Sequence, residues 1–127
     1  MNFNGFHHIG LLVKDLDKSL KFYTEGLGGE ATFSFPIGGG KVIYLVDLGG
    51  NSVVELIPTG TDAPEANARF AHIALNTDDV RGAFDMALKA GATIKSEPKD
   101  AMLGTMAVCN AFVLGPDNES IEFFQVK

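Results

Sequence analysis

The sequence predicts an α+β fold made of two tandem βαβββ modules. Two strand-like runs open alike, with His-Ile-Gly-Leu starting at His8 and His-Ile-Ala-Leu starting at His72. Each opening is followed by one run with helical periodicity and then by three strand-like runs. The last run of each series also matches its counterpart, because each carries a glutamate, Glu55 or Glu122, between apolar residues. One unit written twice explains all three observations.

The first module begins with an apolar run from Phe6 to Val13, which is short and bounded by glycine and charge as a strand would be. Asp15 or Asp17 is expected to cap the helix that follows, and Gly26 and Gly28 are expected to end it. The apolar residues at roughly helical spacing are Leu16, Leu20, Phe22, Tyr23 and Leu27. This helix therefore has a face to bury.

An antiparallel meander is expected to complete the first module. Its three strand-like runs are Ala31 to Phe35, Lys41 to Leu48 and Ser52 to Pro58. Glycine-rich segments at residues 38–40 and 49–51 separate these runs, and such segments form tight turns between neighbouring strands.

The second module repeats the plan. A strand is expected from Phe70 to Thr77 and a helix from about Asp79 to Ala90, closed by Gly91. The three later strands are expected near Thr93 to Glu97, at Met106 to Leu114 and at Glu119 to Val126. A strong turn signal at residues 115–118 separates the last two.

A chain of 127 residues suits one compact domain, so we expect residues 1–127 to form a single domain. Module one should span about residues 4–58 and module two about residues 70–127. Residues 59–69 between them are rich in Thr, Gly, Pro, Asp, Asn and Ala, and are expected to be a linker.

The composition favours a cytoplasmic protein that acts on a small molecule. The net charge of −6, with scattered lysines and arginines, argues against the basic surface that nucleic acids or anionic membranes need. No run approaches the roughly 18 apolar residues of a membrane span, and no signal-peptide pattern opens the chain. The single cysteine, Cys109, cannot form an internal disulfide; it lies in an apolar run and is expected to be a small buried residue.

Four polar residues are expected on the strand faces that the helices do not cover. Side chains alternate along a strand, and the branched apolar residues should meet the helices. This places His8 and Glu55 of the first module, and His72 and Glu122 of the second, on the opposite faces. His7 alternates to the other side and is expected to be structural or exposed.

Two imidazoles and two carboxylates suit a divalent metal such as Zn²⁺, Ni²⁺ or Co²⁺, with positions left for water or a substrate oxygen. Each residue alone also has a structural explanation, since strand histidines usually make hydrogen bonds and a glutamate can face solvent on an edge strand. Four such residues at equivalent places in two repeats favour the metal site.

The chain resembles the vicinal oxygen chelate superfamily over nearly its whole length. The likeness lies in His-His-Ile-Gly-Leu-Leu-Val-Lys-Asp-Leu-Asp-Lys-Ser-Leu-Lys-Phe-Tyr, followed by Gly-Leu-Gly, and in the later runs Val-Val-Glu-Leu-Ile, His-Ile-Ala-Leu and Gly-Pro-Asp-Asn-Glu-Ser-Ile-Glu-Phe. The nearest likeness is to glyoxalase I, or lactoylglutathione lyase, a carbon–sulfur lyase; the next is to methylmalonyl-CoA epimerase. The resemblance implies the glyoxalase/bleomycin resistance/dihydroxybiphenyl dioxygenase fold, usually in a homodimer with the site between modules or subunits.

The resemblance also implies the chemistry. The family's four metal ligands fall at His8, Glu55, His72 and Glu122, which would hold one divalent ion, Ni²⁺, Co²⁺ or Zn²⁺, per site. The metal would bind adjacent oxygens of an α-hydroxycarbonyl or thiohemiacetal substrate, and a glutamate would move a proton through a metal-bound enediolate. By position Glu122 is the first choice for this base, and Glu55 is the equivalent residue of the first module.

Two departures concern glutathione. Family members that bind it carry arginine four residues after the first histidine and asparagine four after the first glutamate, where this chain has Leu12 and Thr59. An apolar side chain cannot pair with a carboxylate as a guanidinium does. The expected loop from Lys99 to Thr105 also lacks the usual Lys-Gly-Gly run.

The sequence is also compatible with other functions of the same superfamily. An epimerase acting on an acyl-CoA shares the chemistry, although that family member often has glutamine where this chain has Glu55. A small-molecule-binding protein of the bleomycin-resistance type needs no metal, but such proteins usually lack the ligand set. An extradiol dioxygenase fits less well, because its iron shell has only one carboxylate.

Overall fold

The computed structural model describes residues 3–26, 28–59, 70–115 and 120–127. The chain divides into two compact units. The first unit is His8–Ala71, and the second unit combines Met1–His7 with His72–Lys127. Most of the expected linker, residues 60–69, lies outside the described residues, as do Leu27 and residues 116–119 of the expected turn and last strand.

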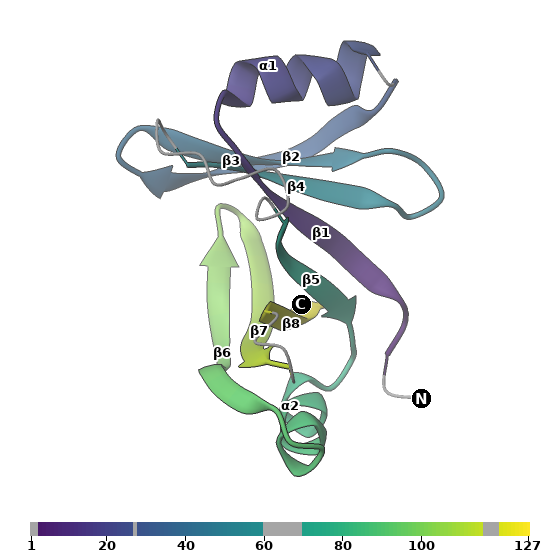
Figure 1. Cartoon of the computed structure of the whole chain (residues 1–127), viewed down its shortest axis with the longest axis vertical. Helices are drawn as coiled ribbons and strands as arrows, with labels where there is room; N and C mark the ends of the chain where they lie inside the picture. The colour runs from purple at the N-terminus through teal and green to yellow at the C-terminus, as the bar shows by residue number, and fades with distance from the viewer. Residues whose placement is uncertain (1–2, 27, 60–69, 116–119) are drawn as a thin grey trace. The chain divides into compact units, whose positions relative to one another are not determined.

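The first unit has the expected order of elements. They are β1 (Phe6–Val13), α1 (Leu16–Lys21), the π-helical turn η1 (Phe22–Gly26), β2 (Glu30–Gly38), β3 (Lys41–Asp47) and β4 (Val53–Pro58). The strands lie in the order β2-β3-β4-β1, and only the β1–β4 pair is parallel. Figure 1 shows α1 lying across one face of this sheet. The expected meander of β2, β3 and β4 is confirmed.

The helical segment of the first unit begins at a predicted cap and ends at Gly26, as expected, but its last turn is not α-helical. Asp15, not Asp17, is the N-cap, and its carboxylate accepts a hydrogen bond from the Lys18 amide at 3.1 Å. The α-helix stops at Lys21 and continues as the π-helical turn η1. In this turn Tyr23 packs into the apolar core while Phe22 stays 55% exposed. An i to i+4 pattern cannot foresee such a widened turn.

The apolar core of the first unit lies between α1 and the sheet, as the alternation of side chains predicts. Its fully packed members and their half-buried neighbours are Val13, Val46, Leu56, Leu11, Leu16, Leu20, Tyr23 and Val54. Leu11 and Val13 of β1 and Val54 and Leu56 of β4 belong to this core, so alternation places His8 and Glu55 on the opposite face of their strands.

The second unit repeats the topology. Its elements are β5 (Phe70–Asn76), α2 (Val80–Lys89), β6 (Thr93–Leu103), β7 (Met106–Leu114) and β8 (Ser120–Val126). The strands lie in the order β5-β8-β7-β6, with β5 parallel to β8. Asp79 caps α2, accepting from the Gly82 amide at 2.9 Å, and Gly91 follows the helix with φ 107°.

Strand β6 is longer than predicted. The expected strand ended at Glu97, and Lys99 to Thr105 was expected to be a loop; the strand instead runs to Leu103. Pro98 accounts for the shorter prediction, because proline usually interrupts a strand. Here β6 lies at the edge of its unit's sheet, and its register with β7 shifts between Ser96 and Lys99. An edge strand with such an irregularity tolerates a missing amide donor.

The first residues of the chain pack with the second unit. The Asn4 amide donates to the Asn76 carbonyl at 2.8 Å, and the Phe3 ring stacks on Phe123 with centroids 5.7 Å apart. The His7 ring lies 4.3 Å from the ring of Phe124. His7 is therefore a packing residue, one of the two roles expected for it. Among the described residues, no helix combines the length and apolar character needed to cross a membrane.

Candidate active site

Parallel strand pairing sets a glutamate beside a histidine in each unit. In the first unit, Gly10 of β1 is the Cα partner of Glu55 in β4. In the second unit, Ala74 of β5 is the partner of Glu122 in β8. The paired residue is two places after the histidine in both units, so the histidine and the glutamate share a face. The repeat seen in the sequence is therefore a repeat of register as well.

Small residues make the diagonal contact between these side chains possible. Gly10 and Ala74 lie on the same face as the histidine and directly beside the glutamate. Ala74 is fully buried and packs with Val108 and Phe124. A larger side chain at either position would stand between the imidazole and the carboxylate.

The structure brings the predicted site residues together as two pairs. His8 Nε2 lies 3.6 Å from Glu55 Oε1 in the first unit. His72 Nε2 lies 3.2 Å from Glu122 Oε1 in the second unit. All four side chains are at least nine-tenths buried. Burial of a carboxylate costs several kcal/mol unless partners compensate for it, and the imidazole of each pair is one such partner.

The geometry of each pair fits a shared divalent ion. Nitrogen and oxygen ligands at about 2.0–2.1 Å from Zn²⁺ are separated by about 2.9–3.6 Å when the angle at the metal is about 90–120°. The distances of 3.6 Å for His8 with Glu55 and 3.2 Å for His72 with Glu122 lie in this range. Neutral imidazole with ionised carboxylate is also the donor set that such ions prefer.

Asn110 is a site residue that the sequence reading missed. Its side chain lies on β7, and Nδ2 donates a hydrogen bond of 3.0 Å to Glu122 Oε2. Both residues are buried. In the sequence, Asn110 is an amide residue within an apolar run. It lies two residues before Phe112 and therefore on the same face of the strand, the face that carries the site. The β7–β8 register brings Asn110 near Glu122, and this register could not be predicted from the apolar run alone.

The imidazole of His72 rests against an aromatic ring. The Phe112 ring meets it edge-on, with centroids 5.6 Å apart, and the ammonium group of Lys95 lies 5.7 Å from the centroid of the same Phe112 ring. Lys95 also donates to the Ser120 hydroxyl at 3.0 Å. Phe112 thereby packs against the imidazole of His72.

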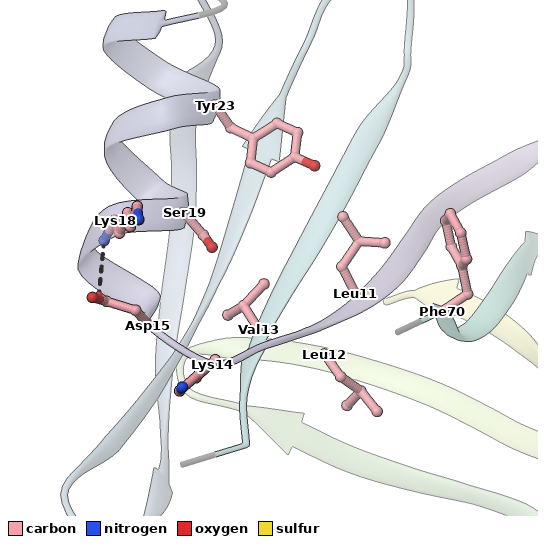
Figure 2. Close-up of a pocket in the computed structure, with 9 residues that line it drawn as sticks. All are labelled: Leu11, Leu12, Val13, Lys14, Asp15, Lys18, Ser19, Tyr23 and Phe70. Carbon is pink, nitrogen blue, oxygen red and sulfur yellow. Dashed lines mark hydrogen bonds between the residues drawn. The ribbon is translucent and has the colours of Figure 1, made fainter. Parts of the chain in front are cut away.

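Leu12 lies on the side of β1 opposite to Leu11 and Val13, as the alternation predicts. Figure 2 shows Leu11 and Val13 directed to the side of Tyr23 and Leu12 directed away from it. These residues line a surface pocket of about 580 Å³ beside α1. The described residues place no arginine in the lining of this pocket. Thr59 is occupied elsewhere, because its amide and its hydroxyl both donate to the Val13 carbonyl, at 3.0 and 3.2 Å.

Cys109 lies in the apolar core of the second unit, against α2, as expected for a small buried residue. Burial raises the pKa of its thiol above the ordinary value of 9.0, and the neighbouring carboxylate of Asp100 raises the pKa further by charge and by a hydrogen bond. Lys127 and Arg81 act weakly in the opposite direction. The thiol is therefore protonated at neutral pH and is a poor nucleophile.

The raised pKa of Cys109 predicts a loss of stability in alkali. The unfolded thiol loses its proton at about 9.0, whereas the folded thiol keeps its proton to higher pH. The contribution is therefore complete below pH 9 and is lost as the pH rises through the folded pKa. Urea unfolding at pH 7 and pH 10 should show a smaller change in the free energy of unfolding for Cys109→Ala than for the wild type. An equal change in both proteins would contradict this prediction.

These features define a class of protein: a paired βαβββ fold in which each unit holds a buried histidine–glutamate pair at the same register. The chain belongs to the Glyoxalase/Bleomycin resistance protein/Dioxygenase superfamily, whose family model matches residues 5–123. The predicted family and the α+β fold are confirmed by this match and by the topology.

Curated relatives and solved structures agree with this assignment. The chain is 35% identical to a probable lactoylglutathione lyase of Synechocystis sp., covering 93% of this chain and 92% of that one. It is 34% identical to a probable lactoylglutathione lyase of Vibrio parahaemolyticus, covering 94% and 89%. The crystal structure of methylmalonyl-CoA epimerase from Mycobacterium tuberculosis matches with a TM-score of 0.72 at 18% identity, covering 98% and 89%. This last likeness supports the fold.

Proposed function

We propose that the protein is a divalent-metal-dependent lyase or isomerase of the glyoxalase I type. Its substrate is an α-hydroxycarbonyl or a thiohemiacetal, and its reaction moves a proton between adjacent carbons. The observation that carries the proposal is the repeated pair of a buried histidine and a buried glutamate, 3.6 Å apart in one unit and 3.2 Å in the other. The names of the two relatives point the same way.

The proposed ligands are His8, Glu55, His72 and Glu122, one pair from each module. The donor set carries a charge of −2 from two carboxylates and none from two neutral imidazoles, so its complex with a divalent ion would be neutral overall. When bound, the ion would act as a Lewis acid on the substrate oxygens, which makes the neighbouring C–H more acidic. Ni²⁺, Co²⁺ and Zn²⁺ all suit these ligands.

Glu122 is the proposed proton carrier. Its carboxylate takes a proton from one substrate carbon, holds it as the neutral acid, and returns it to the adjacent carbon, so no proton is gained or lost overall. Two neighbours keep the group in place, His72 at Oε1 and Asn110 at Oε2. Glu55 is its counterpart in the other pair.

The thiol carried by the substrate need not be glutathione. Leu12 presents an apolar side chain where glutathione-binding relatives have a guanidinium, and it cannot neutralise a carboxylate. The amide and the hydroxyl proton of Thr59 are already used by the Val13 carbonyl. We therefore propose a glyoxalase-type reaction with a thiol handle that is less anionic or differently placed, in a homodimer acting in the cytoplasm.

Metal reconstitution tests the proposed function. Metal-free protein is loaded with Ni²⁺, Co²⁺ or Zn²⁺ and assayed on methylglyoxal mixed with glutathione, coenzyme A or cysteine. Turnover that needs both the metal and a thiol is expected for at least one combination. The His7→Ala variant serves as a matched control, because it removes an imidazole that packs on Phe124 and is not a proposed ligand.

The other outcomes identify the competing functions. Epimerisation of methylmalonyl-CoA by the metal-loaded protein, without turnover of any thiohemiacetal, would identify the protein as an epimerase and not a lyase. Failure to bind any of the three ions stoichiometrically in calorimetric titration would favour a metal-free binding protein and would overturn the proposal.

A further inference from the structure

Asn110 constrains the carboxylate that we propose as the proton carrier. Its Nδ2 donates to Glu122 Oε2 at 3.0 Å, while the other oxygen, Oε1, lies 3.2 Å from His72 Nε2. An ionised carboxylate only accepts hydrogen bonds, so the amide must turn its NH₂ group toward Glu122. The two oxygens of Glu122 therefore have different neighbours, and rotation of the carboxylate would break the bond to Asn110.

The carbonyl oxygen of the Asn110 amide is not stabilised by this arrangement. Its Oδ1 is buried and has no hydrogen-bond partner among the described residues. A buried acceptor without a partner destabilises a fold, and an apolar side chain of the same shape would remove that cost. On the same face of β7, Val108 is such an apolar residue and is almost fully buried. Packing alone therefore does not account for an amide at position 110.

We propose that Asn110 is the positioning residue of Glu122, an inference that rests on the function proposed above. By holding Oε2, Asn110 keeps Oε1 directed to the side of His72, where the ion would bind and the proton would move. Asn110 would act through Glu122. Groups that orient a ligand in this way affect metal affinity as well as rate.

The test compares Asn110→Leu with Cys109→Ala. Leucine keeps the approximate shape of asparagine and removes both polar groups, whereas Cys109→Ala alters the neighbouring residue on the opposite, helix-covered face of the same strand. In calorimetric titration of the metal-free proteins with Ni²⁺, Asn110→Leu should raise Kd by about 10–100-fold, and Cys109→Ala should match the wild type. With a turned-over substrate, kcat should fall in Asn110→Leu while KM changes little.

The outcomes separate this inference from the proposed function. If the wild type binds no ion, the proposed function and the inference both fail. If the wild type binds Ni²⁺ and Asn110→Leu binds it equally well, only the role of Asn110 is overturned. Should Asn110→Leu fail to fold, Asn110→Ser carries the same expectation for Kd, and wild-type affinity in that variant overturns the inference.

Discussion

Replacing Glu122 with glutamine is expected to lower kcat by about 10²–10⁴-fold, the usual contribution of a positioned general acid–base. Glutamine has nearly the same shape and keeps a carbonyl oxygen that can accept from Asn110, so the fold should be retained. It cannot take up the substrate proton. Steady-state kinetics of the metal-loaded protein, with the metal content of each sample measured, give the comparison.

Two further measurements make the result of Glu122→Gln specific. The exposed Glu97 of β6 lies in the same unit, and Glu97→Gln should keep wild-type kcat. In addition, Kd for the ion should rise less in Glu122→Gln than in His72→Ala, because the amide oxygen remains a weak ligand. Wild-type activity in Glu122→Gln would refute its role as the proton carrier.

Loss of the His72 imidazole is expected to abolish stable metal binding. Removal of groups that only orient a ligand already costs about 10–100-fold in affinity, so removal of a direct ligand in His72→Ala should cost at least as much. An ion present at 100 times its Kd stabilises the folded protein by about 2.7 kcal/mol. The wild type should therefore show a higher Tm with Ni²⁺ than without, and His72→Ala should lose this increase.

The equivalent variant of the other module extends the prediction. His8→Ala should lose the Ni²⁺-dependent rise in Tm as His72→Ala does, because the proposal takes one histidine from each module. His7→Ala should keep that rise, since its ring packs on Phe124 instead. A rise in Tm that survives in both His8→Ala and His72→Ala would show that the ion binds elsewhere.

Much of the fold could be predicted because its signals are local. Alternation along Phe6–Val13 separates one apolar face from the face of His8, and β1 follows these bounds. Likewise, Asp79 and Gly91 mark the ends of α2 by capping geometry that involves only nearby residues. Such local signals fail where the tertiary structure overrides them. Pro98 indicates the end of a strand, but β6 continues past it because an edge strand tolerates proline.

The candidate site was predictable in its residue types and only partly in its contacts. Because the unit is repeated, the sequence by itself determined that one histidine and one glutamate per module lie on the faces away from the helices. Tertiary structure decided which histidine meets which glutamate, through the parallel registers that pair Gly10 with Glu55 and Ala74 with Glu122. It also decided that Asn110 reaches Glu122. Register joins residues far apart in the chain and depends on the packing of whole strands, so no local pattern of residues specifies it.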